Sequence, residues 1–161
     1  MRLELINFNE IPFETQLHTL EWRNSESVSE FFKIKQIDEK THRKWLLSLK
    51  QNSPLNIAFI IKVNSSYVGV TYFHSIDYEK RQCDWGIYIY DNSNRGKGLG
   101  SIVLKEILKY AARELNMNKV FLDVKFDNAH AIKLYEKYGF KVEKKDGAFL
   151  RYVNDLTLIN S

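Results

Sequence analysis

The most constraining feature is a strand, turn, helix and strand that follow one another in the middle of the chain. Cys83 to Tyr90 (CDWGIYIY) reads as a strand, and Lys119 to Lys125 (KVFLDVK) reads as a mostly apolar, central one. Between them lies a glycine-rich turn followed by one broad apolar face at helical spacing: Leu99, Ile102, Val103, Ile107, Leu108, Ala111 and Leu115. Two strands joined through a helix predict a crossover connection between parallel strands.

The N-terminal half predicts antiparallel strands and two helices. Arg2 to Phe8 alternates apolar and polar residues, as a strand does. NIAFIIKV and YVGVTYFHSI predict a hairpin around Asn64-Ser65-Ser66. We expect helices from Phe13 to Trp22 and after Asp38, a good N-cap, with a stripe along the second: His42, Trp45, Leu46 and Leu49.

The C-terminal end predicts one more helix and two strands. Asp127 or Asn128 can cap a helix from Ala129 to Tyr138, which Gly139 ends. FKVEKK and the segment from Phe149 to Ile159 read as closing strands. The fold class is therefore α+β: a single domain over residues 1–161, with one mixed, mostly antiparallel sheet and helices on both faces in three αβα layers.

Composition excludes several classes of protein. One cysteine, Cys83, leaves no internal disulfide and no multi-cysteine metal site, and we expect no metal. The 161 residues carry a net charge of +4 without a clustered basic stripe, so we expect no nucleic-acid partner. Without a signal-like segment or a long apolar run, the sequence predicts a soluble cytoplasmic protein without a membrane partner, and it allows a homodimer.

The glycine turn before the long helix predicts an anion site. Free backbone N–H groups and the helix dipole both favour negative charge there, and Arg95 and Lys97 add positive charge. The spacing of Gly96, Gly98 and Gly100 fits neither GxxxxGK[ST] nor GxGxxG. The alternative is a plain flexible turn punctuated by glycine.

Two motifs resemble the GNAT superfamily of N-acetyltransferases. RGKGLG (Arg95 to Gly100) fits [RQ]-x-x-G-x-[GA], and NAHAIKLYEKYGF (Asn128 to Phe140) resembles the family's later motif at the expected distance. The resemblance implies the GNAT fold and acetyl-CoA as co-substrate. It also implies a set of residues that contact acetyl-CoA: Ile87, Tyr88, Ile89, Arg95, Gly96, Lys97, Gly98, Leu99, Gly100, Ser101 and Asn128.

Acetyl transfer from a thioester to an amine also needs an acid, a base and an oxyanion donor. The resemblance implies that Tyr135 protonates the leaving thiolate and that a backbone N–H within Gly86 to Ile89 polarises the carbonyl. Asp84 is the first candidate for the base and His74 the second, with His42 a third possibility. Cys83 is not expected to carry the acyl group, because no histidine or asparagine is arranged with it and the family transfers directly in a ternary complex.

The N-terminal third resembles more narrowly the acetyltransferases of pseudaminic acid biosynthesis, which acetylate the 4-amine of a UDP-linked amino-dideoxy sugar. The matching segments are EWRN, QIDEKTHRKWLLSL, GVTYFHSID and CDWGIY. This resemblance implies that Arg23 and His42 meet the nucleotide diphosphate, and that Tyr88 and His74 line the sugar side. Ser25-Glu26 and the stretch from Tyr90 to Ser93 depart from that pattern.

Three rival classes make different demands on the sequence. WRN also occurs in ribosomal-protein alanine acetyltransferases, so a protein N-terminus or another small amine is an alternative acceptor. A non-catalytic acetyl-CoA-binding module would be expected to lack Tyr135 or the glycines, and both are present. A nucleic-acid-binding domain would need more than Arg43, Lys44 and Lys50, which are sparse and mixed with apolar residues.

Overall fold

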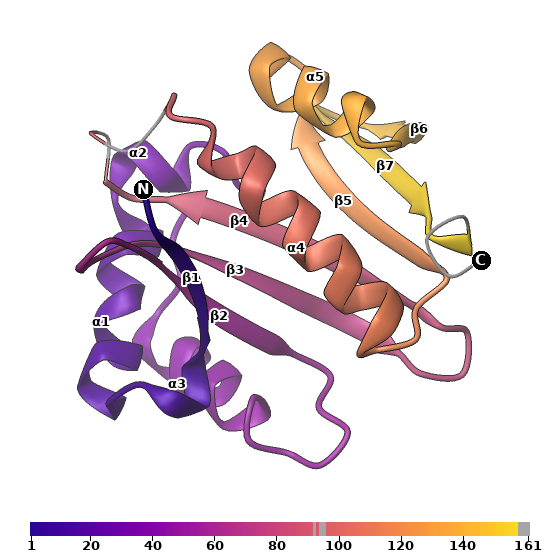
Figure 1. The fold of residues 1–161 in the computed structure, drawn as a ribbon. Helices are drawn as coiled ribbons and strands as arrows, with labels where there is room; N and C mark the ends of the chain where they lie inside the picture. The colour runs from indigo at the N-terminus through magenta and orange to yellow at the C-terminus, as the bar shows by residue number, and fades with distance from the viewer. Residues whose placement is uncertain (92, 94–95, 158–161) are drawn as a thin grey trace. The chain divides into compact units, whose positions relative to one another are not determined.

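A computed structural model describes residues 1–91, 93 and 96–157 of the chain. Its strands are hydrogen bonded in the order β1-β2-β3-β4-β5-β7-β6 (Figure 1). The chain forms two compact units, Met1–His74 with Ile87–Lys97, and Ser75–Gly86 with Gly98–Ser161. Strands β3 (Ser66–Asp77) and β4 (Gln82–Ile89) run through both units.

The first unit is built on antiparallel strands. β1 (Leu3–Asn7) pairs with β2 (Ile57–Val63), and β2 pairs with β3. The end of β4 follows, where the Tyr90 N–H donates to the Val68 carbonyl at 3.0 Å. The helical segments of the unit are η1 (Phe8–Glu10), α1 (Phe13–Asn24), α2 (Glu26–Ser29) and α3 (Glu39–Ser48).

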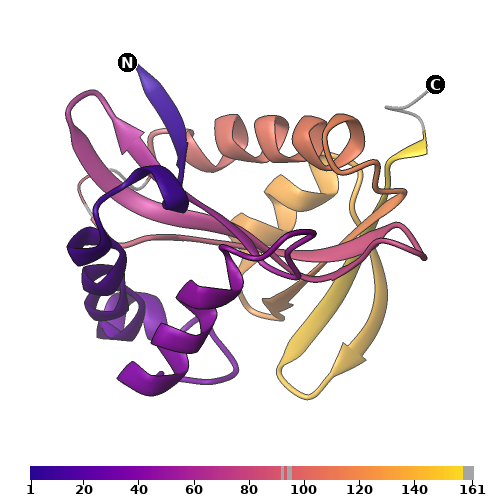
Figure 2. The same ribbon diagram turned by 90° about the horizontal axis from the view of Figure 1, so that it is seen from below.

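One apolar cluster joins these helices to the strands. In Figure 2, α1, α2 and α3 gather on one side of β2 and β3. Phe8 is fully buried, and its ring meets the edge of Trp45 at a centroid distance of 5.6 Å. The cluster takes residues from η1 and the residue after it, from α1 and α3 with its C-cap, and from β2 and β3: Phe8, Ile11, Trp22, Leu46, Leu49, Ala58, Ile60 and Val70. Apolar burial therefore fixes α1 and α3 on these strands.

His42 is part of this packing. Its side chain is buried, its Nε2 lies 3.1 Å from the Gln16 carbonyl and 3.3 Å from the Thr19 hydroxyl, and its ring stacks on Trp45. Burial lowers the pKa of His42, and the hydrogen bond to Gln16 acts in the opposite direction. The imidazole thus links α3 to α1 in its neutral form.

The second unit contains the parallel pair. Gln82, Cys83 and Asp84 of β4 pair with Lys119, Val120 and Phe121 of β5 (Lys119–Lys125), and α4 (Leu99–Arg113) connects the two strands. α5 (Ala129–Lys137) leads to β6 (Lys141–Asp146) and β7 (Phe149–Asp155). β7 pairs antiparallel with β5 on one side and β6 on the other.

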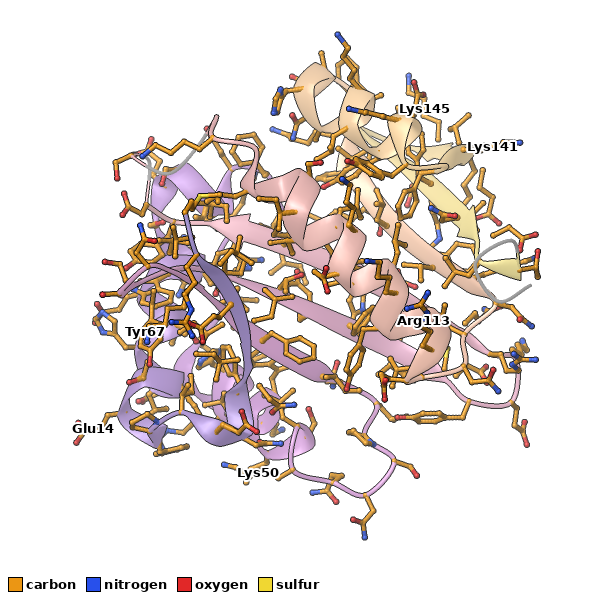
Figure 3. All side chains as sticks on the ribbon, viewed as in Figure 1. Glu14, Lys50, Tyr67, Arg113, Lys141 and Lys145 are labelled. Atoms are coloured by element: carbon orange, nitrogen blue, oxygen red, sulfur yellow. The ribbon has the colours of Figure 1, made fainter. Side chains whose placement is uncertain are left out.

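β6 is an exposed edge strand. Every residue in it is exposed, and Figure 3 shows Lys141 and Lys145 extending away from it. Charged side chains on an edge strand oppose pairing with another chain. The sequence KVEKKD is therefore suited to an exposed edge.

The structure confirms the α+β class, the mixed sheet and the parallel crossover. Asp38 and Asn128 cap α3 and α5 as predicted, accepting from the N–H groups of Thr41 and Ala131. The expected C-terminal strand ends at Asp155, and its last residues lie outside the described part of the chain. The predictions missed η1 and α2, which are short helices without a periodic apolar face.

We predict that His42 makes the stability of the fold depend on pH. Its pKa in the folded protein lies below the ordinary value of 6.5, so the unfolded chain binds more protons. The free energy of unfolding should therefore fall as the pH drops below about 6.5. Thermal melts at pH 7.5 and 5.5 should show a smaller drop in Tm for His42→Gln than for wild type. His130→Gln, at an exposed position on α5, should keep the wild-type drop, and equal drops for all three proteins would contradict the assignment.

Candidate active site

The backbone of the glycine turn explains two of its glycines. Gly96 and Gly98 have φ values of 76° and 77°, in the left-handed region that other residues avoid. A Cβ added at either would meet no atom within 4 Å, so conformation and not space selects glycine. Gly98 is the N-cap of α4 and its carbonyl accepts from Ile102 N–H at 3.3 Å. As in any α-helix, the N–H groups of the first turn of α4 have no acceptor within the helix itself.

Gly100 has a different role, because it lets α4 and α5 approach each other. A Cβ added there would lie 3.2 Å from Leu134 Cδ2 on α5. Leu99 is buried beside it, while Lys97 is exposed. Asn128, the N-cap of α5, uses its side chain to accept from Ala131 N–H at 3.3 Å. Arg95 lies outside the described residues.

Tyr135 occupies the last turn of α5 and is half-buried. Its ring meets Trp85 of β4 edge-on, at a centroid distance of 6.0 Å and an interplanar angle of 86°, and it also contacts Phe140. Trp85 is itself buried. The ring of the predicted acid is therefore positioned by aromatic packing within the second unit.

Asp84 is held by an ion pair, which argues against its predicted role as base. Its two oxygens accept from Arg151 Nη1 and Nη2 at 2.8 and 3.0 Å, and its side chain is 13% exposed. This hydrogen bond is the main reason that the pKa of Arg151 is raised. Both carboxylate oxygens of Asp84 are thus engaged by one guanidinium in a bidentate ion pair. The geometry favours a structural role for Asp84.

Strand register explains the ion pair. Asp84 is opposite Phe121, Asp123 lies two residues further on the same face, and Arg151 is directly opposite Asp123. Arg151 also covers the Phe121 ring at 4.7 Å and contacts Asp123 at 3.4 Å. Sequence reasoning missed Arg151, because the alternation along β7 does not reveal that β7 is the neighbour of β5.

The last residues of β4, Ile87, Tyr88 and Ile89, belong to the first unit and are partly buried. The Tyr88 hydroxyl donates to the Thr19 carbonyl at 3.4 Å, and burial raises the pKa of Tyr88. Gly69 of β3 lies against this segment, since an added Cβ would come within 2.2 Å of the Tyr88 carbonyl oxygen. Close backbone approach therefore explains Gly69, which the sequence analysis did not single out.

Arg23 at the end of α1 holds the segment that leads to α3. Its Nη2 donates to the Ile34 carbonyl at 2.7 Å and its Nη1 to the Lys35 carbonyl at 3.4 Å, and its guanidinium lies 3.8 Å from the centroid of the Phe32 ring. Asn24 holds the same segment through two hydrogen bonds of 2.8 Å with the backbone of Ile37. We call residues 30–37 the α2–α3 loop.

The α2–α3 loop brings aromatic groups together around Arg23. The Phe32 ring meets Tyr88 edge-on at 6.2 Å. Burial lowers the pKa of Arg23, while Tyr72 and Tyr88 beside it act in the opposite direction. Burial also raises the pKa of Tyr72 to about 12, so this phenol stays protonated as a hydrogen-bond donor.

The two predicted histidines differ in their surroundings. His42 is buried in the contact between α1 and α3, and this placement favours a structural role over contact with a diphosphate. His74, at the end of the first unit's part of β3, is partly exposed and lies beside Tyr72, with ring centroids 5.9 Å apart. Of the two histidines, His74 is the one that the packing leaves partly exposed.

Other candidate chemistry finds no support in the described residues. Cys83 is buried, and burial raises its pKa to about 12, so a reactive thiolate is not favoured. Within residues 1–91, 93 and 96–157 there is no group of three or more histidine, cysteine or acidic side chains suited to a metal ion. In the same part of the chain, no helix is both long and apolar enough to span a bilayer.

The sequence matches known acetyltransferases over most of its length. The family model of the acetyltransferase (GNAT) domain matches residues 2–141. The acetyltransferase PseH of Campylobacter jejuni subsp. jejuni serotype O:23/36 (strain 81-176) is 32% identical over 147 residues, which cover 91% of this chain and 90% of that protein.

Solved structures agree with this assignment. Campylobacter jejuni N-acetyltransferase PseH in complex with acetyl coenzyme A superposes with a TM-score of 0.71 at 26% identity, covering 96% of this chain and 99% of that one. For the fold alone, spermidine N-acetyltransferase from Vibrio cholerae in complex with CoA and spermine gives a TM-score of 0.81 at 18% identity, covering 96% of each chain. The chain therefore belongs to the GNAT acetyltransferase family and is an acetyl-CoA-dependent N-acetyltransferase.

Proposed function

We propose that this enzyme acetylates the 4-amine of a UDP-linked amino-dideoxy sugar, UDP-4-amino-4,6-dideoxy-N-acetyl-altrosamine, in pseudaminic acid biosynthesis. The observation that carries the proposal is the 32% identity to PseH, an acetyltransferase of that pathway, across 91% of the chain. The similarity includes the N-terminal third, where acceptor specificity is expected. A protein that shared only the acetyl-CoA motifs would not need to be similar in its N-terminal third.

For acetyl-CoA, we propose that the backbone amides of the turn and of the α4 N-terminus hold the pyrophosphate. The left-handed φ values of Gly96 and Gly98 support this role, because they form the turn that leads directly into the helix N-terminus. Partial positive charge at the N-terminus of the 15-residue helix α4 favours the phosphates further. Lys97 and Asn128 are proposed to add contacts, together with the backbone of Ile87, Tyr88 and Ile89.

For the chemistry, we propose direct transfer in a ternary complex. The Tyr135 phenol returns a proton to the thiolate that leaves as the amide forms. Its aromatic packing on Trp85 supports this role by limiting the orientations of the ring. His74 accepts the proton of the acceptor amine, directly or through water. The ion pair with Arg151 leaves Asp84 less suited to that role.

For the acceptor, we propose that Arg23 and the tyrosines near it face the nucleotide sugar. Two of the five guanidinium donors of Arg23 are engaged by loop carbonyls, so further donors are left for a diphosphate. The protonated phenols of Tyr72 and Tyr88 add hydrogen-bond donors beside it. The nearest alternative is a protein N-terminus or a polyamine, which shares the acetyl-CoA site and differs at the acceptor.

The first prediction concerns the glycine turn. Gly98→Asp places a carboxylate at the N-cap of α4 and should raise the Kd for CoA about tenfold or more, about 1.4 kcal/mol, because it repels the pyrophosphate. Gly98→Asn has nearly the same shape and left-handed strain without the charge, so it is the matched control and should bind several times more tightly. Calorimetric affinity equal to wild type in a folded Gly98→Asp protein would contradict the cofactor assignment.

The second prediction concerns the acid. Tyr135→Phe keeps the ring on Trp85 and removes the phenolic proton, so kcat should fall about 100-fold while the Kd for CoA stays near wild type. Turnover is measured by thiol release under conditions where chemistry limits the rate. A mutant within about threefold of wild type would assign Tyr135 to packing alone.

The third prediction concerns the acceptor. Arg23→Ala should raise the KM for the UDP-amino sugar about tenfold or more without changing the Kd for acetyl-CoA, and UDP should inhibit the wild-type enzyme. Asn24→Ala also loosens the α2–α3 loop but removes no charge, so a smaller increase is expected. Equal increases would make Arg23 a positioning residue. Acetylation of a peptide N-terminus without turnover of any UDP-amino sugar would overturn the substrate and leave the acetyltransferase activity intact.

A further inference from the structure

Two hydroxyl groups meet where α4 and α5 approach each other in the second unit. Ser101, the third residue of α4, is hydrogen bonded through Oγ to the Tyr138 hydroxyl at the end of α5. Two hydroxyls joined by one hydrogen bond retain one O–H that can donate elsewhere. The hydrogen bond with Ser101 is the main cause that lowers the pKa of Tyr138, and the nearby charge of Lys105 acts in the same direction. The geometry allows either hydroxyl to be the donor in this pair, so the remaining O–H is on one or the other oxygen.

Two lysines converge on the same phenol. Lys105 Nζ lies 5.7 Å from the centroid of the Tyr138 ring and Lys137 Nζ lies 5.8 Å from it. Among the described residues, neither lysine has a carboxylate within ion-pair distance. The acidic neighbours in sequence have other partners, since Glu106 pairs with Lys109 and Glu136 accepts from the Tyr152 hydroxyl. Two like charges beside one ring disfavour each other unless an anion joins them.

The position of this cluster relates it to the proposed acetyl-CoA site. Ser101 lies in the first turn of α4, and Lys105 lies one turn later, about 6 Å further along the helix axis. CoA carries a second phosphate group on its ribose, one sugar away from the pyrophosphate. A ligand whose pyrophosphate binds at the α4 N-terminus thus has a phosphomonoester dianion to place nearby.

We propose that Ser101, Lys105, Lys137 and Tyr138 form a subsite for the 3′-phosphate of CoA. The inference rests on the proposed pyrophosphate site and extends it along α4. The two ammonium groups neutralise the dianion, and the free O–H of the Ser101–Tyr138 pair donates to one phosphate oxygen. The subsite thereby distinguishes CoA from analogues that lack the 3′-phosphate.

The test compares the Kd values of CoA and 3′-dephospho-CoA by calorimetry. Wild type should bind CoA about tenfold more tightly than dephospho-CoA, which corresponds to about 1.4 kcal/mol. Lys105→Met and Lys137→Met should each reduce this ratio to about threefold or less, and Tyr138→Phe should reduce it in part. Each variant should bind dephospho-CoA as wild type does, which also verifies folding. Lys109→Met, one turn further along α4 and paired with Glu106, is the matched control and should keep the wild-type ratio.

The outcomes separate this subsite from the proposed function. If wild type binds both ligands equally, or if the lysine variants keep the wild-type ratio, the subsite is wrong and the pyrophosphate site stands. If neither ligand binds, the cofactor assignment itself fails. Adenosine 3′,5′-bisphosphate should compete with CoA better than ADP does. Equal competition by inorganic phosphate at the same concentration would reduce the cluster to a general anion site and overturn the proposal.

Discussion

The parallel pairing of β4 with β5 is the constraint on which the second unit depends. A parallel pair requires a crossover, and here α4 is that crossover. Its N-terminus must therefore follow the end of β4, where Gly98 provides the left-handed cap. The parallel pairing joins residues 82–84 of β4 to residues 119–121 of β5. Asp84, the last paired residue of β4, is bound by Arg151 of β7. The ion pair between Asp84 and Arg151 therefore adds to the few backbone hydrogen bonds of this short parallel pairing.

Some polar side chains of this protein are engaged in contacts within the fold, and others keep hydrogen-bonding groups that can meet a ligand. Asp84 and His42 carry functional groups suited to catalysis, yet Arg151 and the carbonyl of Gln16 occupy them. Arg23 stands between these cases, because its guanidinium supports the α2–α3 loop and retains further donors. The proposed acceptor role of Arg23 thus links loop conformation and acceptor recognition through one side chain. In the proposed scheme the acceptor depends on the α2–α3 loop, whereas acetyl-CoA depends on α4.

The charge distribution along α4 suits the extended anionic ligand that we propose for it. Partial positive charge from the backbone lies at its first turn, and Lys105 follows one turn later. Lys137 and Tyr138 at the end of α5 face the same place, because Gly100 allows the two helices to approach. Gly100 at the contact between α4 and α5 and the two lysines beside that contact therefore belong to one arrangement.

The sequence by itself determined the class of fold, the family and most element boundaries. Hydrophobic periodicity and caps such as Asp38 and Asn128 are local features, so they can be recognised without knowledge of the fold. The glycine turn, Asn128 and Tyr135 were found through motif spacing, which is also local.

Only the tertiary structure decided which polar groups are occupied. The pairing of Asp84 with Arg151 spans 67 residues, and it depends on β7 lying beside β5. The burial of His42 depends on α3 packing against α1. Such contacts arise from strand order and helix packing, which a single sequence does not specify, because alternation and periodicity state which face is apolar but not what covers it.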